Sequence, residues 1–507
     1  MERSAGILLP IFSLPGAYGA GVLGTEAREF VDFLHAAGQK WWQILPIGPT
    51  GAGNSPYTSE STFAGNPLLI DLERLAEEGL LDEADLESAR VPPSDRIDYG
   101  ELYRLREPLL RKAFQRARGR GDKAVRSFSE KNPWLAEYVL YRAAKIHFQN
   151  AAWFDWPDEG LRRHEPEALE RWRRDLVEDV AFRSYVQYWF FTQWAELKDY
   201  ANENGVKIIG DMPIYVSLDS ADVWSERKEF LLHSQGRPSK VAGVPPDYFS
   251  EEGQLWGNPL YDWPSMKRDG FGWWIRRVEG ASKLFDTIRI DHFRGLESYW
   301  AVPAEAETAR MGSWEKGPGM DLLGVLSSWF QGIAFIAEDL GILTEGVHQL
   351  REESGLPGMK VLEFAFSDPS NAYLPHNYQP HCVCYTGTHD NDTAAGWYAS
   401  APQRERAFAE KYLGVSGAEN VRLALLRAGQ GSVAELFVAQ MQDYLGLGSE
   451  SRINVPGVGK GNWRWRLLPG CTTEGLAEEI RSMTSFYGRC PWIPEPEETG
   501  ESDKTEE

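Results

Sequence analysis

The chain has 507 residues, of which 42% are hydrophobic and 25% charged, so it can bury a large core and lacks the composition of a disordered protein. Its formal net charge is −22, and no run of Lys and Arg is long enough to form a basic face. This charge argues against nucleic acid or another polyanion as a partner. A neutral ligand is compatible with an acidic surface.

The four cysteines are too sparse for a disulfide scaffold, and the pair Cys382 and Cys384 lacks the spacing of zinc ligands. In a strand these two side chains point the same way, and we expect both to pack inside. The N-terminal apolar run imitates a signal peptide, but no positive region precedes it and Pro10 and Pro15 interrupt it. No stretch approaches the ~20 apolar residues of a membrane span. We therefore predict a cytoplasmic protein with no membrane partner.

Short apolar runs that end in polar or charged residues recur along the chain. Their lengths and their Ile, Val and Phe content are typical of buried parallel strands, which are apolar on both faces. The runs are Gly6–Phe12, Trp41–Pro46, Val206–Asp211, Thr287–Asp291, Ala334–Glu338, Lys360–Phe364 and His381–Gly387, with a weaker eighth at Arg452–Val455.

Helical patterns separate several of these runs, for example Thr25–Ala37 and Phe182–Asn202, and a last one covers Thr472–Tyr487. Strands that alternate with helices imply a parallel sheet, and eight strands favour a closed barrel over an open sheet. The predicted fold class is therefore α/β, a TIM (β/α)₈ barrel.

The runs are unevenly spaced, and the chain between Pro46 and Val206 is too long for one crossover. We predict one catalytic barrel domain over residues 1–492, with insertion subdomains at about 49–200 and 213–283. The first insertion has helical periodicity, whereas the second is rich in Gly, Pro and Trp and should form ordered loops. Residues 493–507 are acidic without apolar anchors, and we predict a disordered tail.

One glycine motif suggests a different function. Gly19-Ala-Gly21-Val-Leu-Gly24 matches the G-x-G-x-x-G pattern of dinucleotide sites and precedes a helical stretch. However, Ser-Leu-Pro-Gly-Ala-Tyr separates the apolar run from the glycines, where a dinucleotide site has a tight turn. The next run, Trp41–Pro46, also ends without the acid that would bind a ribose. Both points disfavour dinucleotide binding, and we predict no cofactor.

Acidic residues end several of the predicted strands. Asp211, Asp291 and Glu338 each close an apolar run, and Asp390 follows the run at His381–Gly387. One such acid is usually a helix cap or half of an ion pair, because an unpaired buried charge is costly. Four of them at strand ends, where barrel enzymes keep their chemistry, favour an active site.

Paired carboxyls suit glycosyl transfer with retention of configuration. One ionised carboxylate attacks the anomeric carbon, while a protonated carboxyl roughly 5–5.5 Å away donates to the leaving oxygen. Crowded carboxylates oppose one another's ionisation, which keeps the acid protonated. Arg289 lies two residues before Asp291 and shares its barrel face, so it can keep the nucleophile ionised. A structural ion pair is the alternative role for Arg289.

A metal site is a competing explanation for the same residues. His389-Asp390-Asn391-Asp392 beside Asp291-His292 offers donors for a divalent ion. No His-x₃-His or Cys/His spacing accompanies them, and we predict no metal.

Several motifs resemble the α-amylase clan, and most closely the amylomaltases, the 4-α-glucanotransferases of glycoside hydrolase family 77. The resemblance runs from about Gly6 to Trp465, nearly the whole chain. The motifs are Ser55-Pro-Tyr-Thr-Ser, Phe63-Ala-Gly-Asn-Pro, Gly210-Asp-Met-Pro-Ile-Tyr-Val, Gly243-Val-Pro-Pro-Asp-Tyr-Phe, Gly253-Gln-Leu-Trp-Gly-Asn-Pro-Leu-Tyr, Arg289-Ile-Asp-His-Phe-Arg-Gly, Ala337-Glu-Asp-Leu-Gly, Thr386-Gly-Thr-His-Asp-Asn-Asp-Thr and Gly461-Asn-Trp-Arg-Trp-Arg.

The resemblance implies that Asp291 forms a covalent glycosyl-enzyme and that Glu338 is the acid/base. Asp390, with His389 beside it, is expected to hold the ring hydroxyls of the distorted sugar. The substrate-binding residues implied by the motifs are Ser55, Tyr57, Asp211, Asp247, Trp256, Arg289, His389 and Asn462. Tyr57 and Trp256 could equally be packing aromatics if the motifs are set aside.

The resemblance further implies α-1,4-glucans as substrates, glucose as an acceptor and a monomer or small homo-oligomer. It implies no required calcium ion and no C-terminal β-sandwich domain. Gly51-Ala-Gly53-Asn departs from relatives that carry an aromatic residue there, which leaves a secondary glucan site at that place in doubt. An α-glucan hydrolase and a catalytically inactive glucan-binding protein stay open as alternatives.

Overall fold

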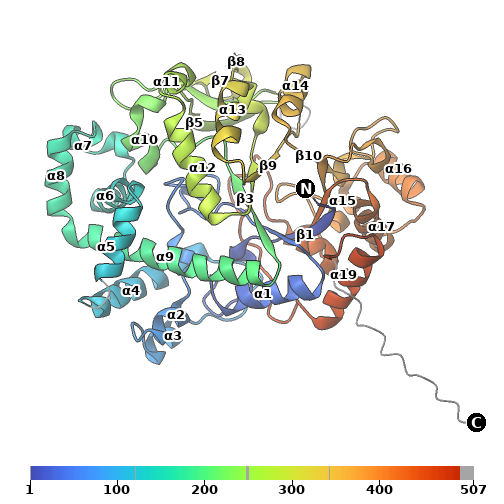
Figure 1. Cartoon of the computed structure of the whole chain (residues 1–507), viewed down its shortest axis with the longest axis horizontal. Helices are drawn as coiled ribbons and strands as arrows, with labels where there is room; N and C mark the ends of the chain where they lie inside the picture. Colours follow the sequence, from blue (N-terminus) through green and yellow to red (C-terminus); the bar gives the residue numbers. More distant parts are fainter. Residues whose placement is uncertain (1, 120–121, 247–250, 342, 492–507) are drawn as a thin grey trace, which may run out of the picture.

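A computed structural model describes residues 2–119, 122–246, 251–341 and 343–491 (Figure 1). Asp247 and the predicted tail over 493–507 lie outside these residues. Eight parallel strands form one sheet: β1 (Ser4–Leu8), β2 (Trp41–Gln43), β3 (Lys207–Met212), β6 (Thr287–Ile290), β9 (Ala334–Ala337), β10 (Gly358–Val361), β11 (Cys382–Tyr385) and β12 (Leu436–Gln440).

The eight strands follow one another around the sheet in chain order. The hydrogen-bonded order is β10, β11, β12, β1, β2, β3, β6 and β9. The two ends of this sheet meet where the Ala337 backbone N–H donates to the Pro357 carbonyl at 2.9 Å. The sheet is a nearly closed parallel barrel surrounded by helices, which confirms the predicted TIM (β/α)₈ fold class.

Seven of the eight predicted strands overlap barrel strands, and the eighth prediction is wrong. The last strand is β12, which is buried at every position, not Arg452–Val455. Its Leu-Phe-Val-Ala-Gln sequence is short and follows a helical stretch, so periodicity alone did not separate it from the helix. Arg452–Val455 lies instead outside any strand or helix, and its polar side chains bond to the loop after β11.

Nineteen helices are described, and they include the three predicted ones. α1 (Thr25–Ala36), α9 (Val177–Glu203) and α19 (Glu474–Phe486) lie within a few residues of the predicted bounds. Further helices of the barrel region are α12 (Gly272–Leu284), α13 (Met320–Trp329), α14 (Glu345–Ser354), α15 (Ala394–Ser400), α16 (Gln403–Leu413), α17 (Ala418–Gly431) and α18 (Met441–Leu445).

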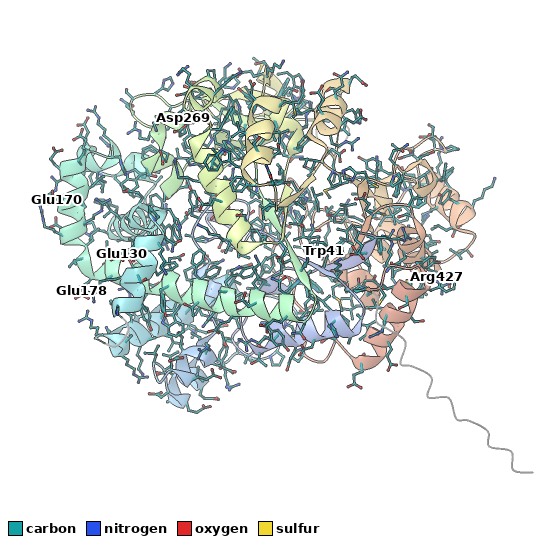
Figure 2. The ribbon with its side chains drawn as sticks, viewed as in Figure 1. Trp41, Glu130, Glu170, Glu178, Asp269 and Arg427 are labelled. Atoms are coloured by element: carbon teal, nitrogen blue, oxygen red, sulfur yellow. The ribbon has the colours of Figure 1, made fainter. Side chains whose placement is uncertain are left out.

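The remaining helices form the large insertion between β2 and β3 and the shorter one after β3. They are α2 (Leu72–Glu77), α3 (Glu83–Ala89), α4 (Tyr99–Ala117), α5 (Asp122–Lys131), α6 (Trp134–His147), α7 (Glu159–Arg162), α8 (Pro166–Asp175), α10 (Ala221–Ser225) and α11 (Trp263–Arg268). In Figure 1 they gather on one side of the barrel. Figure 2 shows Glu170 and Asp269 at the outer edge of this region, whereas Trp41 of β2 lies in the interior.

A small antiparallel sheet was not anticipated from the sequence. Its strands, in hydrogen-bonded order, are β5 (Gln254–Pro259), β4 (Lys240–Val244), β7 (Ser298–Pro303) and β8 (Ser313–Lys316). β4 and β5 lie in the segment predicted as ordered loops, because its many Gly and Pro residues are typical of turns. The sheet carries Trp256 on β5 toward the carboxyl ends of the barrel strands, where its ring contacts His292.

The glycine motif at residues 19–24 serves packing. A Cβ at Gly24 would lie 2.7 Å from the carboxylate of Asp71, and Gly24 directly precedes α1. The motif therefore lets a neighbouring carboxylate approach the start of the helix. Gly210 has a similar role beside the candidate site, because a Cβ there would lie 2.1 Å from the ring of Phe285.

Cys382 and Cys384 are free and buried on β11, as predicted. Burial raises the pKa of the Cys382 thiol to about 12 and that of Cys384 to about 11, so both thiols are poor nucleophiles. No helix among the residues that the structure covers is long and apolar enough to cross a membrane.

Two buried glutamines of α9 hold the long loop that follows β2. The Gln187 amide accepts from Gly65 N–H and donates to Gly65 C=O, both at 2.8 Å. Gln193 does the same for the backbone of Asp71, at 2.7 and 3.0 Å. Each side chain thereby satisfies two buried backbone groups that no strand or helix pairs.

We predict that Gln187→Leu lowers the free energy of unfolding by about 2–4 kcal/mol, because the buried N–H and C=O of Gly65 lose their partner. Chemical denaturation followed by circular dichroism measures the change. Gln349→Leu, an exposed position on α14, is the matched control and should change the same free energy by less than ~0.5 kcal/mol. Equal effects of the two substitutions would contradict the role of Gln187.

Candidate active site

The carboxyl ends of three neighbouring strands carry the first acids of the site. Asp211 on β3 pairs in register with Arg289 on β6, and Ile290 on β6 pairs with Ala337 on β9. Asp291 and Glu338 are the next residues along these two strands. Neighbouring strands lie roughly 4.8 Å apart, and residues in register point to the same face. The two carboxyls therefore start from adjacent positions at one end of the barrel.

Arg289 joins two of the carboxylates inside the barrel. Its Nη1 donates to Asp211 Oδ1 at 2.8 Å, to Asp211 Oδ2 at 2.7 Å and to Asp291 Oδ1 at 2.9 Å. The side chains of Arg289 and Asp211 are 4% and 0% exposed, and that of Asp291 is 27% exposed. Burial opposes the charge, but the carboxylates of Asp211 and Asp291 raise the pKa of Arg289 well above its ordinary value. The guanidinium is a permanent cation beside Asp291.

Glu338 has a different environment, made of backbone N–H groups. Its Oε2 accepts from His292 N–H at 2.6 Å, and its Oε1 accepts from Leu340 N–H at 3.0 Å. His292 adopts a left-handed backbone with φ 53°, which is uncommon for a residue other than glycine. This turn directly after Asp291 brings the His292 N–H onto the carboxyl of Glu338.

Burial raises the pKa of both carboxyls. The pKa of Asp291 rises to about 7, with Arg289 opposing the rise. Burial also raises the pKa of Glu338 to about 8; the charge of Arg289 opposes this rise, and the charge of Asp291 adds to it. Because Arg289 hydrogen-bonds Asp291 directly, Asp291 loses its proton first as the pH rises. Near neutrality the pair therefore holds one ionised carboxylate and one protonated carboxyl.

Tyr57 and His389 extend the cluster on the side of Asp211. The Tyr57 hydroxyl donates to Asp211 Oδ2 at 2.7 Å, and its ring stacks on His389 with centroids 5.0 Å apart and planes at 19°. His389 Nε2 lies 3.4 Å from Asp390 Oδ2. Burial lowers the pKa of His389, so the imidazole stays neutral near neutrality. The four side chains thus form one connected wall.

The support of Asp390 was missed at the sequence level. Asn454 Nδ2 donates to Asp390 Oδ1 at 2.5 Å, and Arg452 Nη2 donates to the Asp390 carbonyl at 2.5 Å. Both donors lie in the segment that was predicted as a strand. Their alternation, with Ile453 buried between them, was compatible with a strand, and no local signal revealed the distant acceptor.

The other predicted substrate-binding residues lie at the margin of the cluster. Ser55 Oγ accepts from Tyr57 N–H at 3.2 Å and so shapes the turn below that ring. Trp256 is 37% exposed and packs edge-on against His292, with centroids 4.8 Å apart. The side-chain amide of Asn462 is hydrogen-bonded to the loop after Arg452. Its Oδ1 accepts from Val455 N–H, and its Nδ2 donates to the carbonyls of Val455 and Val458.

A cavity of ≈ 630 Å³ adjoins this margin at Trp256. Uncharged polar side chains such as Asn54 and Asn258 line it together with the ring of Tyr103, and so do charged side chains such as Arg142, Lys145 and Asp219. Its volume lies within the ~300–1,000 Å³ range of ligand pockets, and its lining offers both aromatic rings and hydrogen-bonding groups. Within the described part of the chain, no group of three or more His, Cys, Asp and Glu could hold a metal ion.

The arrangement places two carboxyls in unlike environments at the ends of adjacent strands. One carboxyl is bonded to a fixed cation, and a second carboxyl on the adjacent strand keeps its proton to higher pH. A sequence profile of the family described as 4-alpha-glucanotransferase matches residues 9–472. The chain belongs to this family of enzymes.

Relatives within the 4-α-glucanotransferase family align over almost the whole chain. The 4-alpha-glucanotransferase of Thermus thermophilus is 49% identical over 96% of this chain and 99% of its own length. The chloroplastic/amyloplastic 4-alpha-glucanotransferase of Solanum tuberosum is 44% identical, over 96% and 87%. The structure of amylomaltase from Streptococcus agalactiae in complex with acarbose superimposes with a TM-score of 0.94 at 39% identity, covering 97% of this chain and 100% of that one.

We predict a bell-shaped dependence of kcat/KM on pH for this 4-α-glucanotransferase. The rate should fall as the pH drops through about 7, because Asp291 gains a proton. It should also fall as the pH rises through about 8, because Glu338 loses its proton. Initial rates with maltotriose across roughly pH 5 to 9 measure the profile. A rate that stays constant through both limbs would contradict these assignments.

Proposed function

We propose that the protein transfers α-1,4-glucan segments between maltooligosaccharides, with retention of configuration, through a covalent glycosyl-enzyme on Asp291. The observation that carries this proposal is the pair of unlike carboxyls on β6 and β9. Asp291 is bonded to the buried Arg289, while Glu338 is held only by backbone N–H groups within the described contacts.

The first step forms the covalent intermediate. The carboxylate of Asp291 attacks the anomeric carbon of the scissile α-1,4 bond, and the bond to the glycosidic oxygen breaks. Glu338 gives its proton to that oxygen, and the rest of the glucan leaves with a free 4-hydroxyl. Asp291 now carries the glycosyl unit as an ester, and Glu338 is ionised.

The second step reverses these roles with a new acceptor. Glu338 takes the proton from the acceptor's 4-hydroxyl, and that oxygen attacks the anomeric carbon. The ester bond to Asp291 breaks and the carboxylate is restored. One α-1,4 bond is broken and one is formed, so no net hydrolysis occurs and no cofactor or metal is consumed.

The residues around the pair have supporting roles in the proposal. Asp390, positioned by Asn454, holds ring hydroxyls of the distorted sugar, with the neutral His389 beside it. Tyr57 stacks on the sugar at the cleavage point and is oriented by Asp211.

Ser55, Trp256 and Asn462 contact neighbouring glucose units. Asp247 lies outside the described residues, and its role on the acceptor side stays a prediction. Trp256 is supported by its exposed ring beside His292. Ser55 and Asn462 are also hydrogen-bonded to nearby backbone, and these bonds position their side chains for the proposed contacts.

Transfer exceeds hydrolysis only if water is kept from the ester until an acceptor arrives. The Gly- and Pro-rich stretch at 243–257 is the proposed cover for the intermediate. Long glucans can also close on themselves when their own 4-hydroxyl is the acceptor. We further propose maltooligosaccharides and amylose as donors, glucose as an acceptor and a cytoplasmic location.

Incubation with maltotriose should yield longer maltooligosaccharides together with glucose, because each transferred segment extends another sugar. Chromatography of the products over time measures this directly. Glucose and maltose without longer products would instead support a hydrolase, which is the competing enzyme class.

Asp291→Asn should lower kcat on maltotriose by about 10³-fold or more, because a neutral amide is a poor nucleophile. The matched control is Asp321→Asn, an exposed acid at the start of α13 that pairs with Lys267. The control should keep wild-type turnover. Wild-type activity in Asp291→Asn would reject a covalent mechanism on Asp291. Such activity would also contradict the alternative of a catalytically inactive glucan-binding protein.

A further inference from the structure

A second cavity, of ≈ 880 Å³, lies outside the barrel. Its walls come from the start of α6, from α9, from α10 and from α12. α9 contacts both α6 and α12, and Figure 1 shows α12 above α9 with α6 beside them. The lining includes none of Asp291, Glu338 and Asp390, so this outer cavity is separate from the catalytic pair.

Three aromatic rings from distant parts of the sequence meet in the wall of the outer cavity. Phe63 comes from the loop after β2, Trp134 from α6 and Phe191 from α9. The rings of Phe63 and Trp134 are nearly parallel, with planes at 15° and centroids 6.2 Å apart, and Trp134 lies 5.6 Å from Phe191. All three are only half-buried and line the cavity, so part of each ring is open to a ligand there.

The charges around these rings disfavour an anionic ligand. The wall carries four Lys and Arg side chains against six Asp and Glu. Three of the four cations are already paired with acids of the same wall, at 2.7–3.8 Å: Lys198 with Asp286, Arg276 with Glu226, and Lys283 with Glu279. A phosphate or carboxylate would therefore have to compete with these acids for the three paired cations. The net negative charge of the wall would also repel it.

Uncharged sugars satisfy both features of the wall. Aromatic faces pack against the apolar faces of pyranose rings, and paired charges still offer N–H donors and oxygen acceptors to hydroxyl groups. The volume is within the ~300–1,000 Å³ range of pockets that bury most of a ligand. We propose that the outer cavity is a second binding site for a maltooligosaccharide segment. The choice of an α-glucan rests on the proposed function, whereas the cavity and its chemistry do not.

The outer cavity shares a wall with the active-site side of the barrel. Ser61, Thr62 and Phe63 line it and also line a small pocket that contains Tyr57 and Asp211. This shared stretch is held firmly, since Thr62 N–H donates to Asp222 Oδ2 at 2.8 Å and Arg277 Nε donates to Thr62 Oγ1 at 3.0 Å. The second site therefore lies directly behind the loop that carries Tyr57, on its outer side.

The test counts glucan sites in a catalytically inactive background. Asp291→Asn is titrated with maltoheptaose by isothermal calorimetry, after chromatography has shown that it leaves this sugar intact. We expect two sites per chain in this background. Adding Trp134→Ala should remove one of them, or raise its Kd at least tenfold, because the central ring of the wall is lost.

Trp172→Ala is the matched control, since Trp172 is a half-buried tryptophan on α8 of the same insertion and does not line the cavity. It should leave both sites. Ala195→Trp provides a second route: Ala195 is exposed on α9 and lines the cavity, so a large ring fills the space without removing core packing. Thermal unfolding of each variant verifies that the fold is retained, and Ala195→Trp should also show a single site.

Turnover separates this proposal from the proposed function. In an otherwise wild-type chain, Trp134→Ala should keep maltotriose transfer within twofold of wild type, whereas a failure of the covalent mechanism would show in Asp291→Asn itself. Two sites in both Trp134→Ala and Ala195→Trp, or a single site in the parent, would overturn the second site. A change of oligomeric state on these substitutions, measured by light scattering, would also overturn it, because the cavity would then be a protein interface.

Discussion

The site depends on one buried cation held between two carboxylates. Arg289 on β6 donates hydrogen bonds to Asp211 on β3 and to Asp291, which follows it by two residues in the sequence. A charge in the interior is tolerated only when it is paired and hydrogen-bonded, so the buried guanidinium favours the positions in which both carboxylates contact it. Tyr57 is then fixed through its hydroxyl on Asp211, and His389 through its stacking on Tyr57. A single constraint inside the barrel thus orders residues from four segments of the chain.

The same constraint separates the behaviour of two carboxyls that are both only partly exposed. Asp291 touches the guanidinium, whereas Glu338 is held by the N–H groups of His292 and Leu340. Burial raises both pKa values, but direct contact with Arg289 keeps Asp291 the more acidic of the two. In the proposed mechanism, the different roles of the two carboxyls therefore follow from the direct contact that Asp291 makes with Arg289 and that Glu338 lacks among the described contacts.

The sequence predicted those parts of the molecule whose signal is local. Seven barrel strands were visible as continuous apolar runs, and Asp211, Asp291 and Glu338 were visible because each ends such a run. β12 was missed because it is a short strand that is apolar except at its last position. It therefore lacks the alternation of apolar and polar residues that would distinguish it from the helical stretch before it. The hydrogen bond from Asn454 to Asp390 could not be predicted for another reason. The two residues are 64 positions apart in the sequence, and only the folded barrel brings them together. Asp247 lies outside the described residues, so its predicted role stays a prediction.

A direct measurement of the central claim is to trap the glycosyl unit on its nucleophile. Maltosyl fluoride needs no proton on its leaving group, so Glu338→Gln should form the ester rapidly and resolve it slowly. Mass spectrometry of the peptides should then find one maltosyl unit on the peptide that contains Asp291, and none when Asp291→Asn is combined with Glu338→Gln. Fluoride release without any adduct, or an adduct on Asp211 or Asp390, would contradict the assignment of Asp291 as the nucleophile.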